Sequence, residues 1–131
     1  MTGGQRMSTY IEFEKWLDKL LLNESFENVI AFSFNLYEGI GTFHMQLIGA
    51  DEFDLDDEDW VCEEVFTSGE DIFVVDRQES GEEWQSGLQF MTNLVQQYLD
   101  MSNNARILHD KTAVAIGFVD GDIDILYQNQ D

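Results

Sequence analysis

A dense run of carboxylates is the part of this chain whose residue types and spacing could do chemistry. Residues 51–60 read DEFDLDDEDW, with seven carboxylates in nine residues followed by Trp60. Like charges in such close order repel one another. Three uses would account for the run: a metal site, a binding face for a basic protein, or a solvated loop of no special purpose.

The run does not fit a calcium-binding loop. An EF-hand loop needs glycine at its sixth position and a bidentate glutamate at its twelfth. If Glu63 is the twelfth residue, Asp57 stands at the sixth, so the motif fails. The second acidic stretch, DGDID at 120–124, contains an Asp-Gly pair that a turn already explains. We therefore expect no specific metal site and no cofactor.

Histidine and cysteine are too few for transition-metal or nucleophilic chemistry. His44 and His109 lie far apart in the sequence, whereas zinc ligands come in pairs at short spacing. Cys62 is followed by Glu63 and Glu64, whose charges oppose thiolate formation, so we expect a buried structural thiol. No pair of carboxylates is singled out for acid–base catalysis. The sequence therefore predicts a protein without catalytic residues, not an enzyme.

The whole chain is strongly acidic. Its 27 Asp and Glu residues outnumber 6 Lys and Arg residues and give a formal net charge of −21. Such a surface repels phosphate, so we expect no direct contact with nucleic acid and none with an anionic membrane. It attracts basic proteins and speeds their encounter. Acidity that serves only solubility is the alternative explanation.

The chain is expected to form one domain. It has 131 residues, 44% of them apolar, and no proline, linker or repeat. The opening MTGGQ looks like the remnant of an expression tag, so we assign residues 1–6 to the tag and 7–131 to a single domain. No signal peptide or membrane span is visible, and a lone cysteine forms no internal disulfide, which together favour a cytoplasmic protein.

The elements that must position the acidic run follow from apolar periodicity. We expect two amphipathic helices: the first starts at a Thr9 capping box, and the second buries a face that includes Trp84. The predicted helices are 9–22 and 82–101, and the predicted strands are 30–36, 43–47, 60–66, 72–75, 114–119 and 122–127. The first two strands form a hairpin with a longer loop. The fold class is therefore α+β, an antiparallel sheet of about five to six strands with both helices packed on one face.

The last two strands give the most detailed prediction. Asp120-Gly121 is typical of a two-residue hairpin loop, in which Gly121 takes a positive φ. That loop sets the register of the strands and places their apolar residues on one face. The predicted pairs are Val114 with Tyr127, Ile116 with Ile125, and Phe118 with Ile123.

A stable scaffold with a dense acidic face fits an inhibitor or adaptor. A basic enzyme that handles nucleic acid has a cationic cleft, which carboxylates can occupy. A tight inhibitor also needs an apolar anchor, and Trp60 would serve if it were exposed; an ordinary core position is the alternative. The predicted contact residues are Asp54, Asp56, Asp57, Asp59, Trp60, Glu63 and Glu64.

Three segments carry a resemblance to a known group of proteins. They are FNLYEG (34–39), DWVCEEVFTS (59–68) and AIGFVDGDIDILY (115–127), arranged around the helix that starts near Trp84. In this order the chain resembles a family of small acidic bacterial proteins, some proposed as immunity proteins of polymorphic or contact-dependent toxin systems. The resemblance implies that the protein neutralises a cognate toxin, and it does not identify the toxin activity that is blocked or the residues that block it; together with the charge of the chain, it suggests a basic protein partner such as a toxin domain.

Two other functions fit the same composition. A small acidic intracellular adaptor or secretion chaperone would be a dimer that binds an extended segment along an apolar groove. A DNA-mimic inhibitor would space its carboxylates like duplex phosphates over an elongated surface. The immunity function favours a monomer, and we expect that state.

Overall fold

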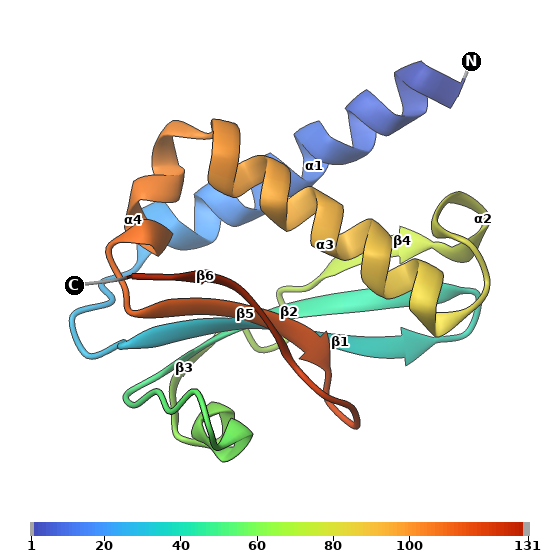
Figure 1. The fold of residues 1–131 in the computed structure, drawn as a ribbon. Coiled ribbons are helices and arrows are strands. Elements are labelled where there is room, and N and C mark those ends of the chain that lie inside the picture. The colour runs from blue at the N-terminus through green and yellow to red at the C-terminus, as the bar shows by residue number, and fades with distance from the viewer. Residues whose placement is uncertain (1, 130–131) are drawn as a thin grey trace.

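The chain forms one six-stranded sheet with helices on one face, in a computed structural model that describes the backbone of residues 2–129 and the side chains of residues 9–129 (Figure 1). This arrangement confirms the predicted α+β fold. Its elements in chain order are α1 (Thr2–Asn23), β1 (Ala31–Gly39), β2 (Thr42–Ala50), η1 (Glu58–Cys62), β3 (Glu64–Thr67), β4 (Phe73–Asp76), α2 (Arg77–Ser80), α3 (Trp84–Met101), η2 (Asn103–Ala105), α4 (Arg106–His109), β5 (Ala113–Phe118) and β6 (Asp124–Gln128).

The hairpin of β1 and β2 forms the middle of the sheet. Pairing runs without interruption from Ala31 opposite Ala50 to Gly39 opposite Thr42. Only Ile40 and Gly41 connect the strands, so the loop is shorter than predicted. Gly41 takes a φ of 69°, a conformation that glycine adopts at little cost and that closes so short a connection.

The sheet is mixed, and the prediction of an antiparallel sheet was wrong in this respect. Its strand order is β3-β2-β1-β5-β6, with β4 also paired to β2. β1 and β5 are parallel, with Phe34 opposite Ile116, and the remaining pairs are antiparallel. Parallel neighbours need a crossover connection, which the chain supplies by passing through α3 before β5. Alternation within a strand does not reveal which distant strand will lie beside it.

α1 and α3 cover the same face of the sheet, as predicted (Figure 1). The side chains that form this core recur at helical spacing on both helices. Its fully buried members include Phe13, Leu17, Met91, Val95 and Tyr98. No helix among the described residues has both the length and the apolar character needed to cross a lipid bilayer.

The predicted helix starts need correction. α1 begins at Thr2 rather than near Thr9, and the Thr9 hydroxyl donates a hydrogen bond to the Glu79 carboxylate instead of capping the helix. α3 begins at Trp84, and this residue is 49% exposed, although the sequence pattern predicted that it would be buried. Periodicity places a residue on a helix face, but a first-turn residue can extend beyond the surface on which the helix packs.

The segment after the acidic run is only partly a strand. The predicted strand 60–66 is divided into the 3-10 helix η1 and the short strand β3, which begins at Glu64. A 3-10 helix has three residues per turn, so residues two apart do not share a side. Trp60 accordingly points inward, while Cys62 is exposed, contrary to the buried thiol that we expected.

The terminal hairpin has a different register from the predicted one. Val114 pairs with Tyr127 as predicted, but the register then shifts, so that Ala115 pairs with Ile125. Leu126 is the extra residue in β6, and such a bulge bends the strand.

This bulge divides the apolar residues of 123–127 between the two faces of the sheet. Leu126 and Tyr127 pack on the helix side of the sheet, while Ile123 and Ile125 pack on the opposite side. The predicted common face is therefore wrong. Gly121 lacks a positive φ because it lies in a link, residues 119–123, that is longer than the predicted two-residue turn.

The acidic loop as a candidate binding site

The acidic loop, residues 51–59, lies on the face of the sheet opposite α1 and α3 (Figure 1). Trp60 anchors it there and is only 2% exposed. The indole packs in a second buried cluster with Ala31, Ala50 and Ala113. Ala31 pairs with both other alanines across β1, β2 and β5, so the three form one row. Their small side chains leave room for the indole, and we call this row the alanine floor.

Partly buried apolar side chains surround Trp60 on the alanine floor. Phe53, from the acidic loop itself, meets it edge to face with ring centroids 5.3 Å apart. Ile125 of β6 and Ile123, which directly precedes that strand, also pack against this cluster. Burying aromatic surface is strongly favourable, so the acidic loop is held on the sheet by a small core of its own.

Carboxylates also fix the backbone of the acidic loop. The Asp54 Oδ1 accepts a hydrogen bond from the Asp56 amide at 2.9 Å, and the Asp57 Oδ1 accepts one from the Asp59 amide at 3.0 Å. The second bond caps the N-terminus of η1. The start of the loop is joined to the residue that follows η1, because the Asp51 amide donates a hydrogen bond to the Glu63 carbonyl oxygen at 3.1 Å.

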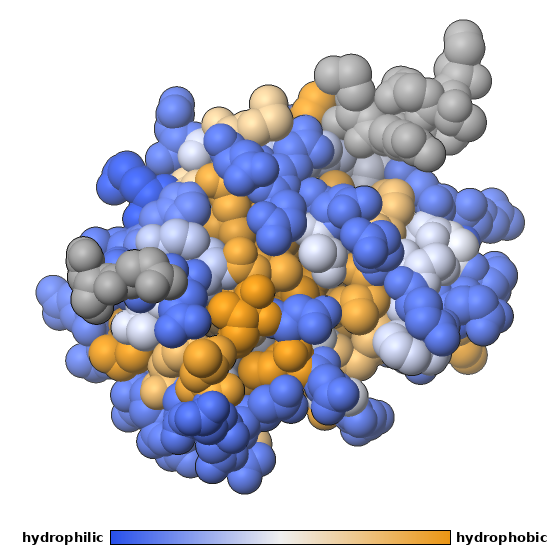
Figure 2. Space-filling model, viewed as in Figure 1, coloured by the Kyte–Doolittle hydropathy of each residue, from blue (hydrophilic) through white to orange (hydrophobic). Residues whose placement is uncertain are grey.

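The six predicted contact carboxylates are all exposed. Asp54, Asp56, Asp57 and Asp59 lie on the loop, Glu63 caps the C-terminus of η1, and Glu64 begins β3. Trp60, the seventh predicted contact residue, is in the core, which decides between the two alternatives for its environment. In the space-filling view the region around η1 is hydrophilic (Figure 2).

The charge of the acidic loop is not balanced by ion pairs. Among the side chains of residues 9–129, the structure contains a single ion pair, in which Arg77 Nη2 lies 3.1 Å from Glu38 Oε1. Neither residue belongs to the acidic loop. Its carboxylates are therefore available to an external cation or basic side chain.

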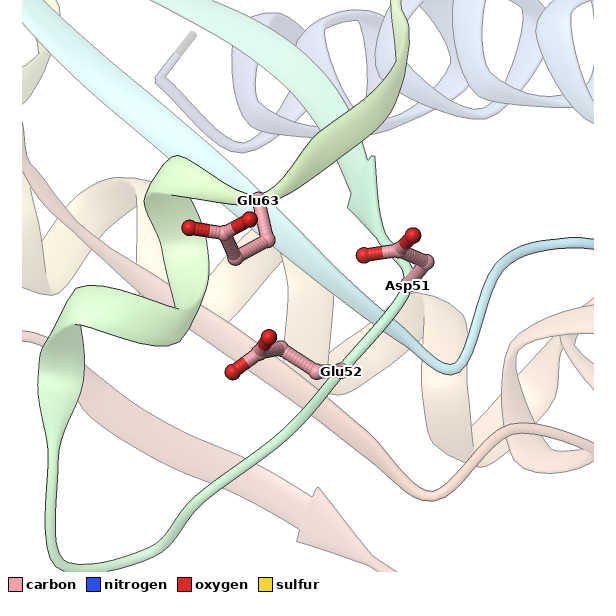
Figure 3. Close-up of side chains that lie close together, drawn as sticks. All are labelled: Asp51, Glu52 and Glu63. Atoms are coloured by element: carbon pink, nitrogen blue, oxygen red, sulfur yellow. The ribbon is translucent and has the colours of Figure 1, made fainter.

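Three carboxylates come close enough together to share a cation. Oxygens of Asp51, Glu52 and Glu63 lie within 4.8 Å of one another. Figure 3 shows that Asp51 and Glu52 begin the acidic loop, whereas Glu63 lies on the segment that follows η1. All three are exposed. They offer three ligand atoms, whereas calcium takes roughly six to eight oxygens, so this group is no more than a partial coordination shell.

The two histidines make local contacts. His44 Nε2 lies 2.9 Å from the Thr42 hydroxyl, and His109 Nε2 lies 2.8 Å from the Leu99 carbonyl oxygen. His109 also stands edge to face with Tyr127, with centroids 4.5 Å apart. These contacts are typical of histidines that support the fold.

The main feature that the sequence did not reveal is the alanine floor. Its one signal is an alanine at the start of β1, the end of β2 and the start of β5, and these positions come together only when the strand pairing is known. Comparisons with protein-family models, curated proteins and solved structures found no match to this chain. The resemblance to immunity proteins therefore stays a prediction from sequence.

Proposed function

We propose that this protein binds a basic protein through the acidic loop and inhibits it, as an immunity protein inhibits its toxin. One observation carries the proposal: exposed carboxylates without ion pairs stand on a loop that a buried tryptophan anchors to the sheet. A loop that served only to keep the protein soluble would not need a fixed shape.

The fixed shape of the loop supports binding for an energetic reason. Holding like charges together costs free energy, and burial of Trp60 and Phe53 offsets that cost. A partner then meets charges that are already arranged, and less conformational entropy is lost on binding. Negative charge of this density also steers a basic partner toward the loop and speeds association at low salt.

The immunity function identifies the kind of partner. A toxin domain that acts on nucleic acid needs a cationic surface for phosphate, and the acidic loop is complementary to such a surface. Occupying that surface would block the substrate without any chemical step. The proposal assigns no catalytic residue and no cofactor to this protein.

The test is the association rate with a basic partner isolated by affinity capture. We compare the wild type with a loop variant in which Asp54, Asp56, Asp57 and Asp59 are changed to Asn. Asparagine at positions 54 and 57 keeps a side-chain oxygen that can accept the hydrogen bonds from the backbone amides of residues 56 and 59. The loop should therefore hold its shape. We expect the loop variant to associate about tenfold more slowly at low salt, with a flatter salt dependence.

A matched control removes the same charge from the helical side of the molecule. Its substitutions are Glu12→Gln, Glu14→Gln, Asp100→Asn and Asp110→Asn. If net charge alone steers the partner, both variants slow association equally. The proposal fails if the loop variant associates as fast as this control, and it also fails if inhibition of the partner survives full neutralisation of the loop.

A further inference from the structure

A concave surface lies at the start of α3, lined by residues outside the acidic loop. This cleft of about 510 Å³ opens between the first turn of α3 and the link from β5 to β6. Trp84, Leu88 and Phe118 supply its apolar lining. Four carboxylates complete it, from Glu38, Asp120, Asp122 and Asp124. We call it the aromatic cleft.

The rings of the aromatic cleft continue a row that begins in the core. Phe43 is buried and stands 5.8 Å from Phe118, centroid to centroid, in an edge-to-face contact. Phe118 in turn stands 6.2 Å from Trp84, with their planes at 89°. Because Trp84 is 49% exposed, the row ends in an indole that solvent and partners can reach.

The inner end of this row already holds a guanidinium group. The Arg77 guanidinium carbon lies 4.0 Å from the centroid of the Phe43 ring. Nη2 of the same side chain donates hydrogen bonds to the Glu38 carboxylate at 3.1 Å and to the Gly39 carbonyl oxygen at 3.1 Å. Glu38 also lines the aromatic cleft. A cation over a ring with a carboxylate beside it is therefore an arrangement that this fold stabilises.

We propose that the aromatic cleft receives an arginine side chain of the basic protein partner. Its guanidinium stacks on Trp84, the ring that attracts cations most strongly, and donates hydrogen bonds to Asp120, Asp122 or Asp124. No ion pair involves these three aspartates among the described side chains. Arginine suits the cleft better than lysine because its planar group both stacks and binds carboxylates in bidentate fashion.

The aromatic cleft and the acidic loop are connected through residues 122–125, where the link from β5 ends and β6 begins. Ile123 and Ile125 pack against the cluster under the acidic loop, while Asp122 and Asp124 line the aromatic cleft. Figure 2 shows apolar surface between η1 and α3 on this side of the molecule. One partner can therefore contact both sites. The inference rests on the proposed function because the arginine is assigned to the same basic partner that binds the acidic loop.

The experiment uses the protein alone and three short peptides as probes. Nitrogen-15 spectra are recorded while a capped Gly-Arg-Gly peptide is added, with citrulline and lysine peptides as controls. Citrulline has nearly the shape of arginine without its charge. We expect saturable shifts of the Trp84 indole and Gly121 amide signals with the arginine peptide, at least roughly threefold tighter binding than with lysine, and no saturable shift with citrulline.

Two variants on α3 locate the response. Trp84→Leu should abolish the shift at Gly121, whereas Met101→Leu, at an exposed apolar position at the other end of the helix, should leave it unchanged.

Equal binding of arginine and citrulline peptides would overturn the inference, as would shifts confined to the acidic loop. If the arginine peptide does not bind but the loop variant associates slowly with the partner, the proposed function holds and only the cleft inference fails. If the peptide binds but the loop variant associates as fast as its control, the proposed function fails and the cleft inference keeps its arginine site.

Discussion

The acidic loop and the aromatic cleft combine carboxylates with a tryptophan in opposite ways. In the loop, Trp60 is 2% exposed and lies beneath the charges; in the cleft, Trp84 is 49% exposed and lies beside them. A buried ring fixes the shape of a charged surface but cannot touch a partner. An exposed ring can stack directly on one. In the complex that we propose, the loop is therefore suited to set the association rate and the cleft to set the lifetime.

The two environments have simple structural causes. Trp60 finds space because alanines lie below it on three neighbouring strands. Trp84 is the first residue of α3, and its ring meets Phe118 at the end of β5 rather than the middle of the core. The alanines beneath Trp60 and the position of Trp84 in the first turn of α3 thus account for the burial of the first ring and the exposure of the second.

The largest expected effect comes from Trp60→Ala. Truncating a buried aromatic side chain leaves a cavity, and here it also frees the loop from the alanine floor. We expect the free energy of unfolding to fall by about 3–5 kcal/mol, measured by urea denaturation. Hydrogen exchange at 51–63 should rise even where the rest of the sheet remains protected.

Trp84→Ala is the matched comparison. The ring is half exposed, so we expect a loss of about 1 kcal/mol, most of it from the contact with Phe118. Similar losses of unfolding free energy for Trp60→Ala and Trp84→Ala would contradict the contrast between a buried and an exposed tryptophan. They would mean that packing on the alanine floor stabilises the protein no more than the contact of Trp84 with Phe118 does.

The second prediction concerns two glycines near the aromatic cleft. A Cβ on Gly117 would lie 2.5 Å from the Asp122 carbonyl oxygen and 3.0 Å from the Ile123 Cα, so the link from β5 to β6 would have to move. We expect Gly117→Ala to destabilise the protein by about 1–3 kcal/mol and to weaken arginine-peptide binding.

Gly121→Ala should change stability by less than about 0.5 kcal/mol. Its nearest contacts to an added Cβ are 3.8 and 3.9 Å away, and its φ is not positive. Thermal or urea unfolding of both variants measures the difference. A large loss at Gly121 would indicate that the link adopts the tight two-residue turn predicted from the Asp-Gly pair.

The reliability of the sequence predictions depended on whether the deciding contact was local. Helical stripes such as Phe13, Leu17 and Leu21 and the alternation of Phe32 and Phe34 predicted the main helices and the first hairpin. The parallel pairing of β1 with β5, the bulge at Leu126 and the environments of Trp60 and Trp84 depend on distant strands. The acidic loop was predicted as the candidate site, but the aromatic cleft was not, because Trp84 and Asp120 lie far apart in the sequence.

The smallest expected effect is on the stability of the loop variant, with Asp54, Asp56, Asp57 and Asp59 changed to Asn. Removing the repulsion between these carboxylates should raise the free energy of unfolding by up to about 1 kcal/mol at low salt. The hydrogen bonds should not be lost, because the asparagine oxygens can still accept them from the backbone amides of residues 56 and 59. Added salt should stabilise the wild type more than the variant, because only the wild type has repulsion left to screen. Urea unfolding at two salt concentrations measures both quantities. A variant less stable than the wild type would show that the loop carboxylates support the fold by more than their hydrogen bonds, and the assignment of their charge to a partner would lose its basis.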